Sequence, residues 1–339
     1  MIILALNATP PQDWDLYRHY LYLDEIKRSG ISLWDFLFNN GSGIGNPDYK
    51  YMLSFNILRW FFSKSGYYSL LPAIVIGIDY SIVSYIIMDH AKYEIGNIKV
   101  LSILLCFTLM PFLFTLSGLR NGIAACIEAL AVYLYLYKNK RSHILILLSF
   151  IAITFHYAAF LAVPFAIISK RRFSYTWSVI ILFSSLILNI LANKMIGWDN
   201  DLLNNIAGIY LSYSSATQFW GSNTVLYGVL TIIFLVVIRL FNIKNKRHSI
   251  INTDNSLFLS NFIVYYSLFI IANLGNYDMV LRPAYILGAM SPVIVSYVTP
   301  PHKHVTVSRL LSWWMVPVIS VICIVLNYIF ITSVVLAFV

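Results

Sequence analysis

Apolar residues in this chain run in long unbroken blocks, and they do not alternate with polar ones. A helix needs about 20 residues to cross the hydrocarbon core of a bilayer, and most blocks have about that length. A transmembrane barrel would instead show alternation over about ten residues per strand. The blocks cover 67–88, 100–117, 119–137, 142–169, 174–192, 224–241, 257–275, 283–298 and 311–336. The pattern predicts an all-α polytopic membrane protein.

Composition supports this class. Of the 339 residues, 59% are apolar and 11% are charged, whereas a soluble domain carries about 25% charge. These values exclude a soluble globular protein and a disordered one. The three cysteines all lie in apolar blocks and are interpreted as packing residues. We expect one integral-membrane domain over 1–339, with about 10 transmembrane or half-spanning helices.

The block 142–169 leaves its path open, because it has 28 residues with His156 near its middle. It is either one tilted helix or a hairpin. In the hairpin arrangement, 14 basic residues after position 66 fall on one face of the membrane and three on the other. A single crossing removes this bias. The positive-inside rule therefore favours a hairpin whose tip, near His156, faces outward. The net charge of +9 then reflects cytoplasmic loops, and we expect no nucleic-acid partner.

This topology places residues 1–66 outside, although they carry six basic residues. The rule weakens for long loops, and a loop that meets an anionic substrate should be basic. Because nothing in 1–66 would carry this segment across the membrane, we expect a first helix upstream of Met1, or its remnant in 1–8. Segment 50–62 is amphipathic and too short to span, so we place it at the interface.

A second external loop is expected at 198–222. It mixes aspartate, asparagine and serine side chains with Trp220. Polar side chains beside aromatic rings are typical of sugar-binding loops, but an interfacial aromatic belt has the same composition. Both interpretations stay open from the sequence alone.

Ionisable residues inside apolar blocks are costly and are therefore functional candidates. Three of them share the outer face. Arg120 opens the helix at 119–137, His156 lies at the hairpin tip, and Arg282 directly precedes Pro283 at an outer helix start. Arginine at a helix N-terminus is opposed by the helix dipole, whereas an anion is stabilised there. The alternatives are snorkelling arginines and a hydrogen-bonded core histidine.

Two acidic residues, Asp79 and Glu128, also lie within apolar blocks. We interpret both as interhelical hydrogen-bonding groups, with a proton pathway as the less favoured alternative.

The N-terminal segment gathers carboxylates and aromatic rings. Asp13, Asp15, Tyr17, Tyr20 and Tyr22 lie within ten residues. Carboxylates accept hydrogen bonds from sugar hydroxyls, rings stack on sugar faces, and an aspartate can act as a base. A solvated loop with interfacial tyrosines is the plainer alternative. Asp13-x-Asp15 is a weak metal motif, because it supplies few oxygen ligands.

The chain contains no Walker A loop, GxSxG or HExxH motif and no nucleotide-binding fingerprint. A nucleotide-sugar donor bound by a cytosolic domain is therefore not expected. The donor would be activated in another way, such as by a lipid diphosphate.

Five short motifs follow one another along the chain. They are Asp15-Leu16-Tyr17 with Tyr20, Asn46-Pro47-Asp48-Tyr49, Leu119-Arg120-Asn121-Gly122, Thr154-Phe155-His156-Tyr157 and Arg282-Pro283-Ala284-Tyr285. Taken in order, these motifs resemble those of the EpsG-like branch of the Wzy-type polysaccharide polymerases, over roughly residues 13 to 300. The chain departs from the family pattern at Asn46 and Asp48, where the family has an acid and a glycine, and around Ala158, where the family has a small polar residue. The family pattern also leads us to expect a first transmembrane helix upstream of Met1.

The resemblance implies a multi-pass glycosyltransferase of the bacterial inner membrane, with GT-C-like architecture and an active site that faces the periplasm. It would join undecaprenyl-diphosphate-linked repeat units into O-antigen of lipopolysaccharide, or into capsule or exopolysaccharide. Its partners would be the lipid-linked donor and acceptor glycans, membrane lipid and a chain-length regulator. No cofactor and no metal are expected.

The reaction needs the departing diphosphate stabilised and the acceptor hydroxyl deprotonated. We assign Arg120 and Arg282 as diphosphate clamps. His156 is either the base or a hydrogen-bond partner, and Asp15 is the rival base. The residues expected to line the sugar site are Asp13, Tyr17, Tyr20, Asp48, Tyr49, Tyr277 and Asp278.

Three other functions compete with a polymerase. A flippase for the same lipid-linked units would also use outer arginines, but transporter sites lie near the midplane on broken helices of repeated halves. An O-antigen ligase would use similar residues with another acceptor. A membrane-bound acyltransferase also uses an intramembrane histidine but gives no reason for two outer arginines.

Overall fold

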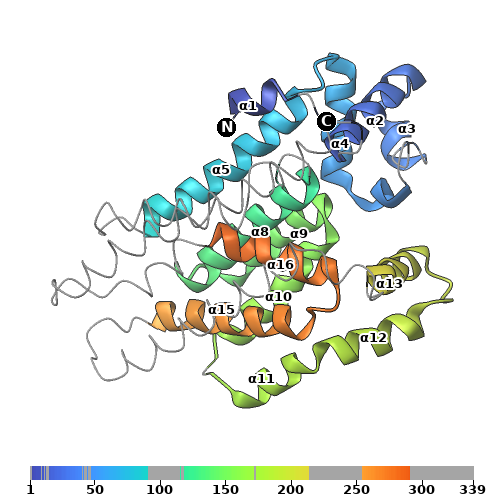
Figure 1. Ribbon diagram of the computed structural model, residues 1–339. Helices are drawn as coiled ribbons and strands as arrows, with labels where there is room; N and C mark the ends of the chain where they lie inside the picture. The colour runs from blue at the N-terminus through green and yellow to red at the C-terminus, as the bar shows by residue number, and fades with distance from the viewer. Residues whose placement is uncertain are drawn as a thin grey trace, which may run out of the picture. The chain divides into compact units, whose positions relative to one another are not determined.

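A computed structural model describes most of the chain, and all regular elements in the described residues are helical (Figure 1). These residues form two compact units, and each is treated by itself below. The first contains the described residues of Met1–Leu130, Leu148–Ala158 and Gly288–Val339, and the second those of Ala131–Leu147 and Ala159–Leu287. The described residues are 2–8, 10, 12, 15–39, 41, 44, 47–90, 115, 118–171, 173–213 and 254–290.

The N-terminal part of the first unit is a set of short helices. We expected segment 1–66 to be an external stretch with one amphipathic helix at 50–62, and that helix is α4. Further helices precede it because local side chains cap and pack them. Ser32, for example, accepts a hydrogen bond from the backbone N–H of Asp35 at 3.1 Å and so caps α3. The elements are α1 (Ile2–Leu6), α2 (Asp15–Ser29), α3 (Leu33–Phe38), the 3₁₀ helix η2 (Pro47–Tyr51) and α4 (Leu53–Ser65).

Helices α2 and α3 both pack on α4, and α1 lies along α5 (Leu70–His90), as Figure 1 shows. Gly77 permits the second contact, because Cδ1 of Ile2 lies 3.2 Å from the place a Cβ would take. The apolar face of α4 buries Phe55 and Phe62. Trp60 donates its ring N–H to the carbonyl of Ile31 at 3.0 Å, which ties α4 to the start of α3.

Two described helices are long and apolar enough to cross a membrane, namely α5 and α8 (Leu119–Leu136). Helices α11 (Tyr175–Leu182) and α12 (Ser184–Met195) together have the length of a third crossing, bent by 50°. The predicted blocks 224–241 and 311–336, and 100–117 apart from Thr115, lie outside the described residues. The chain is thus an all-α membrane protein, and the total of about ten spans stays a prediction.

The block 142–169 is broken at its middle. Helix α9 (Ser142–Phe155) ends before His156, the 3₁₀ helix η3 (Tyr157–Leu161) follows, and α10 (Ala162–Ser169) completes the block. Beyond its two ends, Nζ of Lys170 donates to Oδ1 of Asn139 at 3.0 Å. Helix α9 alone has 14 residues and is about 21 Å long. The contact between Lys170 and Asn139 therefore means that the chain reverses direction within this block.

The second unit is assembled around α15 (Asp254–Ala272), on which α10 and α11 both pack. Asn261 of α15 donates to the carbonyls of Ser169 and Arg171 at 3.3 and 3.1 Å, where α10 ends. The hydroxyl of Tyr265 accepts from the N–H of Ser174 at 2.9 Å, just before α11 begins. Both bonds satisfy backbone groups that a helix end leaves open.

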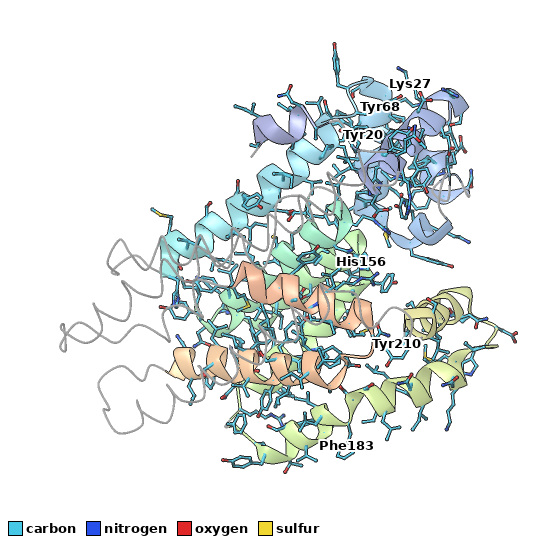
Figure 2. The ribbon with its side chains drawn as sticks, in the orientation of Figure 1. Tyr20, Lys27, Tyr68, His156, Phe183 and Tyr210 are labelled. Carbon is cyan, nitrogen blue, oxygen red and sulfur yellow. The ribbon has the colours of Figure 1, made fainter. Side chains whose placement is uncertain are left out.

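The bend between α11 and α12 lies at Phe183, which Figure 2 labels, next to the serine pair Ser184-Ser185. Helices bend where side chains interfere with the regular backbone hydrogen bonds. Here the hydroxyl of Ser184 accepts from Asn273 at 3.0 Å, and the carbonyl of Ser185 accepts from Asn189 at 2.9 Å.

The external loop expected at 198–222 is wrong for residues 201–213, which form helix α13 (Asp201–Tyr213). Asn200 accepts from the N–H of Leu203 at 3.1 Å and caps its start. Ala207 and Tyr210 then pack on Ala192 of α12. Asparagine favours loops by composition, but Asn200 acts here as a helix cap. Residues 214–222 lie outside the description.

Helix α16 (Tyr277–Ala289) begins six residues before the block predicted from 283. Its start is set by Asn276, whose side chain accepts from the N–H of Met279 at 3.2 Å and donates to the carbonyl of Tyr210 at 2.9 Å. Pro283 therefore lies inside the helix, and Arg282 lies in its second turn. The expectation that Arg282 stands at a helix start is wrong, because the cap stands at Asn276.

Candidate functional site

Arg120 is the second residue of α8 and is half-buried in the first unit. Its guanidinium lies 4.2 Å from the ring centre of Tyr49, and its Nη1 donates to Sδ of Met52 at 3.3 Å. A thioether is a weak acceptor, and a ring face is not a counter-ion. Among the described residues no carboxylate forms an ion pair with Arg120.

A second arginine, Arg59 of α4, lies against the same ring, with its guanidinium carbon 4.6 Å from the ring centre of Tyr49. Its side chain is buried, with 1% exposed. Burial lowers the pKa of Arg59 to about 10, and the positive charge of Arg120 acts in the same direction. Two positive charges thus share one aromatic ring.

His19 of α2 completes this cluster, which we name the Tyr49 cluster and define as His19, Tyr49, Arg59 and Arg120. The imidazole stacks on Tyr49 with ring centres 5.9 Å apart. Burial, and then the charges of Arg120, Arg59 and Arg18, hold the pKa of His19 well below its ordinary value of 6.5. Neither ring nitrogen has a hydrogen-bond partner in the described part of the chain. The imidazole is therefore neutral near pH 7.

Tyr49 was expected to line the sugar site, but its ring is 1% exposed. Arg59, Arg120, His19 and Phe55 contact it within the protein. A covered ring leaves no face for a sugar. The expectation that Tyr49 contacts a sugar therefore disagrees with its burial, and the ring instead contacts Arg120 within the protein.

His156 lies at the reversal between α9 and η3 and is buried, with 2% exposed (Figure 2). Its Nδ1 accepts a hydrogen bond from the backbone N–H of Ala158 at 3.1 Å. A neutral imidazole carries one proton, so that proton is on Nε2. In this tautomer Nε2 already carries a proton, so the ring is poorly suited to act as a base there.

The start of α4 contacts both Arg120 and the helix end that precedes His156. Met52, directly before α4, contacts Arg120. Ser54, two residues later, shares a hydrogen bond of 2.7 Å with Thr154, which lies two residues before His156. Met52 and Ser54, which are two residues apart, thus contact two side chains that are distant from them in the sequence.

Arg282 belongs to the second unit, on α16, and is half-buried. The described surroundings of the start of α16 are neutral side chains, chiefly Asn273, Asn276 and Tyr210. The helix dipole acts mainly within the first turn, so it favours an anion at Arg120 more than at Arg282.

Of the other predicted site residues, some belong to the described α2 helix and the rest have side chains outside the described part of the chain. Asp15 begins α2 and forms an ion pair of 3.6 Å with Arg18, while Tyr17 is half-buried on the same helix. Tyr20 faces Tyr68 with ring centres 6.4 Å apart, and burial raises the pKa of its hydroxyl to about 12. Figure 2 shows both rings near Lys27. Asp13 and the side chains of Asp48, Tyr277 and Asp278 lie outside the description.

The two buried acids behave differently. Glu128 accepts from the hydroxyl of Ser149 at 3.0 Å, which confirms the expected interhelical hydrogen bond. Asp79 has no hydrogen-bond partner among the described residues, so the same expectation is wrong for it. It packs against Gly122 of α8, where an added Cβ would lie 2.7 Å from its Oδ2. Gly122 offers no side-chain partner, only space.

Sequence reasoning missed His19 and Arg59. Both lie in a segment interpreted as external and amphipathic, where charged residues are ordinary. The available signal was the position of Arg59, which falls among the apolar residues of α4 in the stretch Asn56-Ile57-Leu58-Arg59-Trp60-Phe61-Phe62.

The membrane-length helices define an integral membrane protein, and a cluster of cationic side chains lies near the start of one of them. A model of the EpsG family matches residues 1–339. The chain therefore belongs to the EpsG family, a Wzy-like polysaccharide polymerase family, which confirms the resemblance drawn from its motifs. Searches of curated proteins and of solved structures find no match.

Proposed function

We propose that this protein is a glycosyltransferase that joins undecaprenyl-diphosphate-linked oligosaccharide repeat units at the periplasmic face of the bacterial inner membrane. The growing glycan leaves its lipid diphosphate and is transferred to a new lipid-linked unit. Transfer proceeds without a metal ion, because arginine side chains stabilise the departing diphosphate. The products belong to the class of O-antigen, capsule or exopolysaccharide.

The observation that carries this proposal is the state of Arg120. It is a half-buried guanidinium in the first turn of α8, beside a second arginine, and no described carboxylate pairs with it. Such a group favours an anion with several oxygens, since the guanidinium donates two parallel hydrogen bonds to phosphate. The nearby helix N-terminus acts in the same direction.

In the proposed reaction the acceptor hydroxyl oxygen bonds to the anomeric carbon of the donor sugar. The bond from that carbon to the phosphate oxygen breaks, and its electron pair leaves with the lipid diphosphate. Arg120, with Arg282 as the second clamp, neutralises the developing charge. His156 is buried, so we assign it to hydrogen bonding that supports the site from within the protein and not to direct contact with the substrate. The hydroxyl proton passes to the Asp15 carboxylate.

The test is a reconstitution with purified full-length protein and lipid-linked repeat units. We expect a ladder of longer glycans on one lipid, and the ladder should persist in the presence of a chelator. Movement of the lipid-linked units across the bilayer without a new glycosidic bond would indicate a flippase. Transfer to a different acceptor in a single step would indicate a ligase. Loss of the ladder with chelator would overturn the metal-free mechanism.

The role of Arg120 is tested in the same assay with Arg120→Ala. Removal of one transition-state donor costs about 100-fold or more in rate. Arg28→Ala is the matched control, because Arg28 is an exposed arginine with 79% of its side chain accessible. Ladder formation by Arg120→Ala at the wild-type rate would remove the basis of the proposal.

A further inference from the structure

We propose that Arg59 is a positioning residue, which acts on Arg120 through the ring of Tyr49. The inference rests on the proposed function, because it concerns how the diphosphate clamp is held. Neither the motifs nor family membership assigns a role to Arg59. The argument depends on three observations in the first unit: how Arg59 is anchored, how Tyr49 is anchored, and what then remains for Arg120.

Arg59 is itself immobilised by neutral acceptors. Its Nη1 donates to Oδ1 of Asn56 at 2.9 Å, and its Nη2 donates to the carbonyl of Ile44 at 2.6 Å. With 1% of its surface exposed, it has no access for a substrate. The guanidinium is therefore a fixed positive charge inside the protein.

Tyr49 is held at both its backbone and its ring. Asn56, which accepts from Arg59, also donates to the backbone carbonyl of Tyr49 at 2.6 Å. One asparagine thus couples the two residues. The ring is enclosed by Arg59, His19, Tyr22 and Phe55, and the ring centres of Phe55 and Tyr49 are 5.8 Å apart. Its plane is consequently defined by contacts on α2 and α4.

Arg120 receives the remaining contact with this ring. A free arginine side chain has several rotatable bonds, and its ordering costs conformational entropy. Stacking at 4.2 Å on a ring that is already immobilised reduces the freedom left to be lost when an anion binds. The fixed charge of Arg59 beneath the same ring also makes the region more favourable for an anion. The stacking effect requires Tyr49 as the link, whereas the charge of Arg59 acts through space.

The experiment compares pairs of variants that differ in one property. Arg59→Lys and Arg59→Met both lose the hydrogen bonds to Asn56 and Ile44, but only Arg59→Lys keeps the charge. Inorganic pyrophosphate serves as the probe, measured as an inhibitor of ladder formation per folded protein. Monodisperse elution in detergent defines the folded fraction. Lys64→Met is the control, because it removes an exposed charge from the same helix.

For Arg59→Met we expect about a tenfold higher half-inhibitory pyrophosphate concentration and about a tenfold lower kcat/KM for the donor, with Arg59→Lys between it and the wild type. Lys64→Met should match the wild type. A residue that only supports folding would lower the folded fraction and leave the pyrophosphate inhibition of the folded protein unchanged. Identical inhibition of Arg59→Met and the wild type would overturn the inference.

The ring is tested separately, so the inference remains falsifiable if Arg59 variants do not fold. Tyr49→Phe keeps the aromatic face and should stay within about threefold of the wild type, whereas Tyr49→Leu should lose about tenfold. Equal activity of these two variants would also overturn the inference. If the wild type itself makes no ladder, the proposed function fails. If it makes one that Arg120→Ala abolishes while Arg59→Met and Tyr49→Leu are unaffected, only the positioning role fails.

Discussion

The two arginines that the sequence assigned to one diphosphate clamp have different surroundings. Arg120 lies in the first turn of its helix, stacks on a buried ring and has a second arginine nearby. Arg282 lies in the second turn of α16, in a region where asparagine side chains cap helix ends and bind neutral carbonyls. Each belongs to a different compact unit.

The difference shows that charged residues in apolar blocks can have two kinds of surroundings. At Arg120, a half-buried guanidinium stacks on an aromatic ring without an ion-paired carboxylate among the described residues, which is a costly arrangement unless an anion binds. Around the start of α16, each described polar contact satisfies a backbone or side-chain partner, which is the ordinary way to stabilise helix ends.

The largest expected effect comes from removing both arginines, singly and together. Arg120→Ala and Arg282→Ala should each lower the rate of ladder formation by about 100-fold or more. If they hold the same diphosphate, the double variant should be scarcely slower than the worse single variant, because residues that act as a unit are not additive.

Initial rates of ladder formation measure this cycle, with Lys194→Ala as an exposed control on α12. A wild-type rate for Arg282→Ala would restrict the anion site to the Tyr49 cluster. Full multiplicative loss in the double variant would show that the two arginines act independently.

The next effect concerns the packing that places Arg120. In Gly122→Ala the new Cβ would lie 2.7 Å from Oδ2 of Asp79 and 2.9 Å from Cγ2 of Thr115. Overpacking of this kind costs about 1–3 kcal/mol, and the first turn of α8 must shift. We expect lower stability in detergent unfolding and slower ladder formation. Gly208→Ala on α13 is the control, since no atom lies within 4 Å of its added Cβ. Equal stability of the two variants would contradict the described packing.

The Tyr49 cluster should also make stability depend on pH. Burial and the nearby arginines hold the pKa of His19 well below 6.5, so below pH 6.5 the unfolded chain binds a proton that the folded protein does not. Each unit by which the pH is lowered below 6.5 should then decrease the free energy of unfolding by about 1.4 kcal/mol. Above about pH 7 the free energy of unfolding should not depend on His19. Unfolding of wild type and His19→Phe between pH 7.5 and 5.5 measures the difference. Parallel curves would refute the buried neutral imidazole.

The smallest effect is expected at the start of α16. Asn276→Ala removes the helix cap and the hydrogen bond to the carbonyl of Tyr210, at a cost of about 1 kcal/mol in stability. Asn193→Ala, which removes an exposed hydrogen bond to the carbonyl of Asn189, should cost less. Because Arg282 lies on the helix that Asn276 caps, kcat/KM of Asn276→Ala for the donor measures how far the position of Arg282 depends on this cap. The two variants having the same stability would argue against the cap.

Hydropathy located the described helices because burial in lipid requires continuous apolar surface. Helix α8 begins at the predicted residue 119, and α5 begins within three residues of its block. The predicted helix starts were wrong where short-range hydrogen bonds from capping side chains set the start of the helix. Asn200 and Asn276 extend helical structure into stretches that composition assigned to a loop or to a later helix start.

For the candidate site, the sequence identified Arg120 and His156 as costly residues but assigned Tyr49 to the wrong surroundings. The burial of the Tyr49 ring and the proximity of Arg59 depend on contacts between residues 10 or more positions apart, and further long-range contacts around the site join Arg120 with Met52 and Ser54 with Thr154. No local pattern encodes such contacts.

The sequence by itself therefore determined the protein class, the family and the residues whose charge is hard to accommodate in a membrane, since these follow from transfer free energies and ordered motifs. Only the tertiary structure decided which of those residues share a neighbour. It placed the ring of Tyr49 against Arg120 and introduced Arg59 and His19, because packing between helices, and not hydropathy along the chain, sets which charges lie close enough to act on one another.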